Sequence, residues 1–441
     1  MNIRYRLIAF SLLILSVVVG ACNPATSTPM LSSTASSPTK ISFMVFGDPA
    51  EIAAYQKIVE AYVAGHPDQQ VELLPVPSQS EYRARLAADI AAGTPADVVL
   101  ENYRRVAAFA VKHAFEPLGP YLFESKVIQV SDFYPQAIQA FTIGDQVVCI
   151  PQNISSPVIY YNQDLFEAAG AALPTDQWTW DDFLSAAQAL TLDTDADGQI
   201  DQYGFGVSAE LMRLAPFVWQ NGGQLIDNYL TPTAFTLGSG PDLEAFQWFV
   251  DLQVKWHVVP SAEAEESEDS ESRFINGRTA MYMNSRRSTT TFRESAKFNW
   301  DVAPMPVGKY RASVLHSDGY CVPATSQHLE AAWAFVEFAN SVEGQTLIAS
   351  TGRTVPSLIK VAESSAFLDP NQAPANSQVW LDAVPSIGTF PLLSTWVEIE
   401  ELANAQIEGA FYGQVSVEEA ASKINEFTGI EFQKGVSGET D

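Results

Sequence analysis

Residues 158–190 read VIYYNQDLFEAAGAALPTDQWTWDDFLSAAQAL, and this stretch decides the fold class. It opens as a short apolar strand that ends at Asn162, which can cap a helix that stops at Gly170. After a loop, Thr179 and Asp182 have the spacing of a capping box, so a second helix begins there. Apolar side chains recur at helical spacing in both segments. The stretch therefore predicts strand, helix, loop and helix.

The segment that precedes this stretch predicts a mostly parallel sheet. Apolar runs at residues 41–46, 71–74 and 95–100 alternate with helical patterns, the second of which covers residues 81–92. The order β-α-β-α-β is typical of parallel strands with helical crossovers. The fold class is therefore α/β, and ligands of such sheets sit beyond the carboxyl ends of the strands.

Three side chains at these strand ends are candidate ligand-binding residues. Asp48 follows the first strand, and Glu101 and Tyr103 follow the third. For Asp48 the alternative role is to cap the helix that comes next. The ring of Tyr103 lies beside carboxylate and amide groups, and this combination suits a sugar, whose CH groups stack while its hydroxyls form hydrogen bonds.

Composition describes a folded protein with an acidic surface. The chain has 441 residues, a length greater than one hydrophobic core usually serves. Of these residues 47% are hydrophobic and 11% are aromatic. The formal net charge is −28. Such a surface repels nucleic acid and anionic lipid, so we expect no nucleic-acid partner.

The N-terminus has the pattern of an export signal. Two arginines precede an apolar run at residues 7–19, which is shorter than the ~20 residues of a membrane-spanning helix. Residues 19–22 read VGAC and resemble a bacterial lipobox, in which Cys22 is lipidated; the alternative is a plain secretory signal. We expect a lipoprotein signal peptide at residues 1–21 and a flexible Ser/Thr/Pro-rich tether at residues 22–40.

An acidic loop at residues 193–201 reads DTDADGQID and is a candidate calcium site. Carboxylates at positions 1, 3, 5 and 9, with glycine at position 6, match the start of an EF-hand loop, but Gly204 replaces the bidentate Glu of position 12. The alternative is a solvated acidic turn, as we also expect for residues 263–271. The candidate ligands are Asp193, Asp195, Asp197, Gln199 and Asp201.

Several ordered patches of the chain resemble one family. They include YYNQDLFEAAG at residues 160–170, GTPADV at 93–98, FINGRTAM at 274–281 and WDVAPMPVG at 300–308. The chain resembles the extracellular solute-binding proteins of ABC transporters, family 1, the sugar-binding group. The resemblance implies a periplasmic-binding-protein-like fold, with two α/β lobes, a hinge and an interlobe cleft.

The resemblance also implies how the chain is divided. Lobe 1 takes residues 41–150 plus about 318–375, and lobe 2 takes residues 151–317 plus about 376–432. Cys149 and Cys321 lie in two similar apolar strands that resemble the family's crossings between the lobes. We expect them to form a disulfide; two buried free thiols are the alternative.

Further candidate cleft residues come from matches to the family's loops. Asn153 follows the first crossing and Asp318 precedes the second, while Trp219 and Asn221 lie in a WQNGG turn. Arg353 belongs to a GRTVP loop, and Trp396 starts the C-terminal helices. Turn formation is the alternative for Asn153, core packing for Trp219, and packing between the lobes for Trp396.

One departure from the family concerns the ligand. Many relatives follow the FINGRTAM patch with small residues and a cleft Trp, whereas this chain has NSRR at residues 284–287. The departure predicts that Arg286 brings a guanidinium into the cleft, where it can bind vicinal hydroxyls or a carboxylate.

The function implied by the resemblance is capture of a mono- or oligosaccharide and its delivery to the permease subunits of an ABC importer. We expect a monomer on the cell surface or in the periplasm, anchored by lipid to the bacterial membrane, with no required cofactor and at most a structural Ca²⁺.

Other functions stay open at this point. A polyamine suits the acidic chain, a sugar acid suits Arg286, and a ligand sensor could use the same fold. A secreted glycoside hydrolase with two carboxylates is a further alternative. The sequence contains no G-x-S-x-G and no H-E-x-x-H, and its five histidines are scattered, so we expect a binding protein and not an enzyme.

Overall fold

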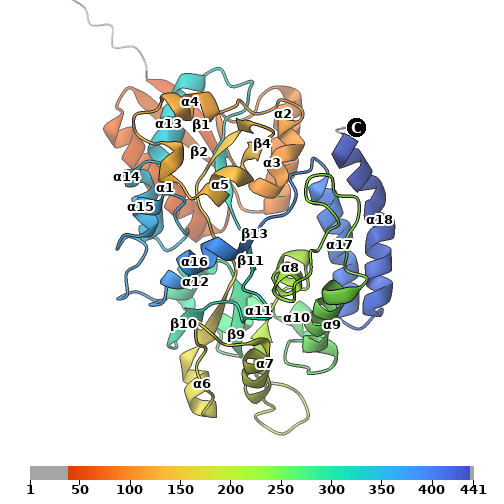
Figure 1. Cartoon of the computed structure of the whole chain (residues 1–441). Helices are drawn as coiled ribbons and strands as arrows, with labels where there is room; N and C mark the ends of the chain where they lie inside the picture. The colour runs from red at the N-terminus through yellow and green to blue at the C-terminus, as the bar shows by residue number, and fades with distance from the viewer. Residues whose placement is uncertain (1–37, 438–441) are drawn as a thin grey trace, which may run out of the picture. The chain divides into compact units, whose positions relative to one another are not determined.

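The computed structural model of the chain describes residues 38–437 (Figure 1). Its first sheet has five strands in the order β2-β1-β3-β12-β6. Three of them are β1 (Thr39–Phe46), β2 (Gln69–Val76) and β3 (Val98–Asn102). Strand β1 pairs in parallel with both β2 and β3, which confirms the parallel arrangement that the alternation of strands and helices predicts.

Helices α1 (Pro49–Gly65) and α2 (Gln79–Ala92) connect these strands. Asp48 caps α1: its side chain accepts a hydrogen bond from the backbone N–H of Glu51 at 2.9 Å, and the Glu51 carboxylate accepts one from the N–H of Asp48 at 3.0 Å. This capping box satisfies backbone donors that the first helical turn would otherwise leave without partners. The alternative role for Asp48, a helix cap, is confirmed.

The other two strands enter the sheet from distant parts of the chain. Strand β12 (Asp318–Cys321) lies between β3 and β6 (Cys149–Pro151) and is antiparallel to both. In this register Asp318 lies opposite Asn102 and Gly319 lies opposite Pro151. The chain therefore leaves the first sheet after β6 and returns to it through β12.

The same register places the two cysteines opposite each other, and they form a disulfide. Cys149 and Cys321 are fully buried, and their Cα atoms are 4.5 Å apart. The bond joins positions separated by 172 residues. It thus closes the whole segment of chain that lies between the two crossings.

The second sheet has four strands in the order β10-β7-β9-β8. They are β7 (Val158–Asn162), β8 (Tyr203–Gly206), β9 (Thr279–Asn284) and β10 (Trp300–Ala303). Strand β7 is antiparallel to β9 and β10, while β8 is parallel to β9. Every residue of β7 is buried, which explains why its sequence is a continuous apolar run rather than an alternating one.

Helices α6 (Gln163–Ala169) and α7 (Trp180–Ala189) confirm the pattern predicted from residues 158–190. The side chain of Asn162 accepts a hydrogen bond from the third N–H of α6, and Gly170 ends this helix in the left-handed conformation with φ of 63°. Thr179 opens α7 with the predicted capping box. Local sequence signals therefore determine this part of the fold.

Four helices build the rest of the second lobe around a separate core. These are α8 (Leu211–Gln220), α9 (Gly240–Val254), α17 (Trp396–Phe411) and α18 (Val417–Ser437). In Figure 1 the two C-terminal helices, drawn in blue, lie side by side. Their buried faces supply aromatic and aliphatic residues to a core distinct from that of the first sheet.

The remaining elements flank or connect the two sheets. The first core cluster also reaches into the second sheet through Tyr160, Tyr282 and Trp300. The elements that flank or connect the sheets are α3 (Tyr103–Ala110), α4 (Gly119–Glu124), η1 (Val130–Asp132), α5 (Pro135–Ala140), β4 (Thr142–Ile143), β5 (Gln146–Val147), α12 (Ser288–Ser295), β11 (Ser313–Val314), α13 (Leu329–Ala339), α14 (Val342–Ser350), α15 (Ile359–Ala362), α16 (Gln378–Ala383), η2 (Val384–Ser386) and β13 (Ile387–Gly388).

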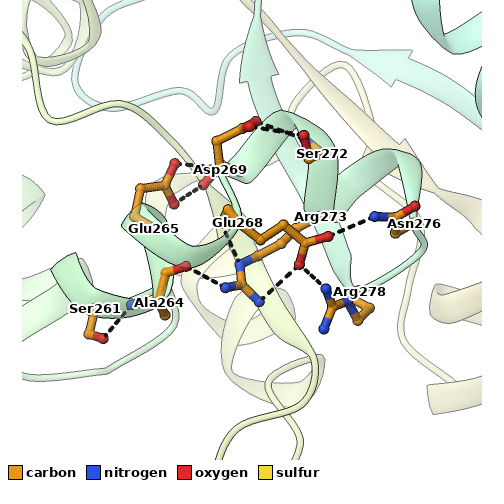
Figure 2. Close-up of polar contacts among 10 residues, drawn as sticks. Ser261, Ala264, Glu265, Glu268, Asp269, Ser272, Arg273, Asn276 and Arg278 are labelled. Carbon is orange, nitrogen blue, oxygen red and sulfur yellow. Dashed lines mark hydrogen bonds and ion pairs between the residues drawn. The ribbon is translucent and has the colours of Figure 1, made fainter.

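The acidic run that we predicted to be a solvated loop instead forms two short helices, α10 (Ala262–Ser267) and α11 (Ser270–Ile275). Figure 2 shows why: its carboxylates have partners close by in the chain. Glu268 forms ion pairs with Arg273 and Arg278, and its neighbours cap α11. Local partners of this kind support helices in the segment, so the loop prediction was wrong.

Several predictions for the N-terminus lie outside the described residues. These are the signal peptide at residues 1–21, lipidation of Cys22 and most of the tether at residues 22–40. Within residues 38–437, none of the helices combines the length and the apolar character that crossing a membrane requires.

The disulfide leads to a prediction that mass spectrometry can check. We expect iodoacetamide to add nothing to Cys149 and Cys321 when a chain starting at residue 38 is denatured without reductant. With reductant, two alkyl groups should appear. Since a cross-link over a long loop typically contributes about 2–4 kcal/mol, the variant C149S/C321S should unfold at lower urea concentration. Two alkyl groups without reductant would contradict the bond.

Candidate functional site

A polar cavity of about 530 Å³ is lined by residues from both sheets and from α17. Its volume is in the range of roughly 300–1,000 Å³ that small-molecule sites occupy. Among the described lining residues, Phe46 and Tyr282 are the Phe, Tyr or Trp side chains, so polar groups dominate. The charged lining residues are Glu51, Arg83, Arg104, Arg105, Glu210, Arg213, Glu271, Arg287, Asp318, Arg353, Glu400 and Glu401.

One wall of the cavity is the polar edge of the first sheet. The Asn153 side-chain oxygen accepts a hydrogen bond from the backbone N–H of Asp318 at 2.7 Å, and the Asn102 amide donates to an Asp318 carboxylate oxygen at 2.9 Å. Within the described part of the chain, the Asn153 amide nitrogen and the second Asp318 oxygen form no hydrogen bond. The edge therefore offers a ligand one fixed donor and one fixed acceptor.

A buried ion pair stands beside this edge. Arg353 and Glu51 bind each other, and each side chain is 5% exposed. Burial is the largest influence on the pKa of Arg353 and lowers it, but the nearby acidic groups, Glu51 first among them, together outweigh burial and raise the pKa. The pair is needed because a lone buried charge costs several kcal/mol by typical estimates, roughly 3–5 when one partner of a pair is removed.

Part of the cavity lining is basic. Arg213 and Arg287 lie near His316, whose Nε2 is 3.5 Å from an Arg213 nitrogen. Burial, followed by the nearby guanidinium groups, holds the pKa of His316 well below its usual range. Since a guanidinium only donates hydrogen bonds, the neutral imidazole accepts at Nε2.

Ion pairs join helix α3 to helix α17 at the cavity wall. Arg104 binds Glu400, and its Nε donates to the Asn102 side chain at 3.1 Å. Arg83 and Glu401 form a second, more exposed pair at 3.6 Å. These contacts connect residues on α2 and α3 of the first lobe with a helix of the second.

Three of the sequence-predicted site residues line the cavity: Asn153, Asp318 and Arg353. They come from the loop after β6, the start of β12 and the loop after α14. The structure brings these distant positions together, as the resemblance to the family's cleft loops implied.

Three predicted residues at strand ends do not line the cavity. Asp48 serves as the cap of α1, and Glu101 is 1% exposed and accepts from Arg105 Nε at 2.7 Å. Tyr103 is fully buried, and its hydroxyl accepts from the backbone N–H of Phe390 at 3.3 Å. Burial raises the Tyr103 pKa. The expected stacking surface is therefore part of the core.

The remaining aromatic candidates and Asn221 also lie elsewhere. Trp219 donates from Nε1 to the Tyr229 hydroxyl at 3.1 Å, and Asn221 donates to the Pro241 carbonyl at 2.7 Å. Trp396 is fully buried. Trp219 packs against the second core cluster, as its core alternative predicts, and Trp396 lies inside that cluster, which neither of its two predicted roles describes. Neither ring lines the cavity.

Arg286 is buried away from the cavity, at 1% exposure. It donates to the Gly352 carbonyl at 3.1 Å and lies 4.7 Å from the centre of the Trp380 ring. Burial lowers its pKa. The prediction that Arg286 enters the cleft was wrong. The adjacent Arg287 is exposed and lines the cavity instead.

Sequence reasoning missed Asn284, Arg213, Arg287 and His316. The NSRR departure was a usable signal for Asn284 and Arg287, because it follows the FINGRTAM patch at the point where many relatives carry a cleft Trp. His316 lies two residues before Asp318, so the approach to β12 could have indicated it. Arg213 had no local signal: its place in the cavity depends on how α8 packs against α9, β11 and α17, which brings its side chain to Asn284 at the end of β9.

The candidate calcium loop gathers three carboxylates at the surface. One carboxylate oxygen from each of Asp193, Asp195 and Asp197 lies within 4.8 Å of the other two. Asp201 instead accepts hydrogen bonds from Thr194, which lower its pKa. The three carboxylates fit the oxygen-rich coordination that Ca²⁺ prefers, with Asp201 bracing the loop. Gln199 contributes a backbone N–H to Asp197.

This fold and cavity define a two-lobed solute-binding protein. The family of bacterial extracellular solute-binding proteins matches residues 47–346, and the chain belongs to that family.

A solved substrate-binding protein of an ABC transporter from Listeria monocytogenes, in complex with cycloalternan, has a TM-score of 0.80 and 25% identity, covering 88% of this chain and 97% of that one. A mannitol-binding protein of Pseudomonas aeruginosa is 23% identical over 307 residues, 67% of each chain. The sn-glycerol-3-phosphate-binding periplasmic protein UgpB of Escherichia coli K12 is 26% identical over 264 residues, 56% of this chain and 57% of that one.

The buried pair at the cavity leads to a prediction about stability. Replacing Arg353 by Gln leaves the Glu51 carboxylate buried without its cation, so R353Q should destabilise the chain by about 3–5 kcal/mol. Urea unfolding followed by fluorescence would measure the effect. As a control, R85Q on the exposed face of α2 should stay within about 0.5 kcal/mol of the parent. An R353Q midpoint equal to that of R85Q would contradict the prediction.

Proposed function

We propose that the chain captures a saccharide in this cavity and delivers it to the membrane-spanning subunits of an ABC importer. The observation that carries the proposal is the polar sheet edge, where Asn153 and Asp318 hold a donor and an acceptor without partners among the described residues. Fixed donors and acceptors of this kind match the vicinal hydroxyl groups of a sugar.

The family and its relatives support the same reading. Relatives of this chain bind cycloalternan and mannitol, which are hydroxyl-rich solutes. We propose that the solute leaves this chain unaltered, so that the chain is a binding protein and not an enzyme. Hydrogen bonds dominate recognition in this proposal, because the predicted stacking residues Tyr103 and Trp396 are buried in the core.

The location follows from the family together with the N-terminal sequence. A member of this family acts outside the cytoplasm. We propose that Cys22 carries the lipid that holds a monomer at the cell surface or in the periplasm, with residues 22–40 as its tether. The lobe boundaries given above, at residues 150/151, 317/318 and 375/376, are part of this proposal.

Calorimetry tests the proposed function directly. We expect at least one mono- or oligosaccharide from a broad panel to bind and to be recovered unchanged by mass spectrometry. D318N removes one charged acceptor, and because hydrogen bonds to charged groups contribute about 1.5–3 kcal/mol, affinity should fall roughly tenfold or more. D145N, in the exposed turn between β4 and β5, is the matched control. A hydrolysed sugar would overturn the proposal in favour of an enzyme.

We also propose that the loop at residues 193–201 binds Ca²⁺ as a structural site. Like charges held this close repel one another, and a bound cation removes that repulsion. We therefore expect a chelator to lower the thermal midpoint and Ca²⁺ to restore it. D195N should abolish this response, whereas D145N should keep it. An unchanged midpoint, together with no metal by atomic absorption, would rule the site out.

A further inference from the structure

We propose that the solute is acidic, and that its carboxylate or phosphate group binds between Arg213 and Arg287, beside His316. This inference rests on the proposed function, since it names the chemical class of the saccharide that the same cavity would take.

Arg287 is the first observation. It is exposed, lines the cavity and precedes helix α12 directly. Within residues 38–437, its guanidinium forms neither a hydrogen bond nor an ion pair. Since Arg presents five N–H donors in a planar fork that matches an oxyanion, a cavity-lining Arg without a protein partner is a ready anion contact.

Arg213 is the second observation, and it is independent of the first. Its residue is 7% exposed, and one of its terminal nitrogens donates to the Asn284 side chain at 3.1 Å. Its Nε is buried and lacks a hydrogen-bond partner among the described residues; Glu210 lies 3.6 Å away, beyond hydrogen-bond reach. A buried donor left without an acceptor is costly, so an anionic acceptor from the solute would satisfy it.

The pKa of His316 indicates the sign of the electrostatic field beside the two arginines. After burial, the largest influences on its pKa are the cations Arg213, Arg104 and Arg287, which all lower it. Of these three, Arg104 is already neutralised by Glu400. Arg213 has the carboxylate of Glu210 at 3.6 Å, so Arg287 is the cation of the three that forms no ion pair within residues 38–437. A neutral imidazole beside these guanidinium groups adds no charge of its own.

Two carboxylates of the cavity, Glu210 and Glu271, lie on the same side as the arginines. Glu210 is 3.6 Å from Arg213 Nε and its side chain is 36% exposed, while Glu271 accepts from the Ser288 hydroxyl at 2.7 Å. Neither carboxylate forms a hydrogen bond with the Nε of Arg213 or with Arg287 among the described residues. A carboxylate or phosphate placed between the two arginines would therefore meet donors that still lack an acceptor.

The anion and the sugar-binding edge belong to one cavity. Asn284 ends strand β9 and holds Arg213, while Asn153 and Asp318 lie at the edge of the first sheet. Both groups of residues line the same cavity of about 530 Å³. An acidic saccharide can thus place its hydroxyl groups at the sheet edge and its charged group at the arginines.

Calorimetry with matched pairs of probes tests the inference. The pairs are galacturonate against galactose, digalacturonate against lactose, and glucose 6-phosphate against glucose, with spermidine as the cationic probe. We expect the acidic member of one pair to bind at least about tenfold tighter than its neutral partner, with affinity falling as salt rises. Whether the uronates or the phosphate show this preference identifies the anion.

The variant R287Q supplies the second part of the test. Arg287 is exposed, so the variant should fold, and it should cut binding of the preferred acidic probe about tenfold while leaving a neutral sugar within twofold. R85Q, which makes the same change on the outer face of α2, should leave both unchanged.

The outcomes separate the two proposals. Neutral sugars that bind as tightly as acidic ones, with no effect of R287Q, would overturn the inference and leave sugar capture standing. Preference for spermidine, or binding of no acidic probe at millimolar concentration, would overturn the inference as well. If no saccharide of either kind binds, the proposed function falls with it.

Discussion

The insertion of β12 between β3 and β6 is the interaction on which the rest of the structure depends. This antiparallel ladder sets Asp318 opposite Asn102 and leaves Asn153 hydrogen bonded to the backbone of Asp318. Residues more than a hundred positions apart thereby form one polar edge. The same register pairs Cys149 with Cys321, so a covalent bond holds the ladder where the chain leaves the first sheet and returns to it.

Charge is distributed unevenly within the cavity that this edge bounds. Arg353 and Glu51 neutralise each other, and Arg104 pairs with Glu400 on the facing helix. Within residues 38–437, Arg287 forms no ion pair, and the buried Nε of Arg213 has Glu210 at 3.6 Å but has no hydrogen-bond partner. An anionic solute would supply an acceptor to both groups. Relatives that bind mannitol and glycerol phosphate show that family membership alone does not set the charge of the solute.

The sequence predicted well what local physics determines. Asn162, Gly170 and the Thr179 capping box lie where the chain needs a cap, because each satisfies backbone groups within a few residues. Tyr103, by contrast, follows a strand end yet points into the core, where the Phe390 backbone donates to it. Arg213 reaches the cavity because α8 packs against α9, β11 and α17. Such placements depend on tertiary packing, which periodicity and spacing do not encode.

A crystal structure of the protein with the saccharide that binds most tightly in calorimetry is the most direct measurement of whether the β3-β12-β6 edge holds the solute. We predict density in the cavity, with hydrogen bonds from the ligand to Asn153 and Asp318 and its charged group within hydrogen-bond distance of Arg287. Ligand density outside this cavity, or a ligand in it that touches neither Asn153 nor Asp318, would contradict the central claim.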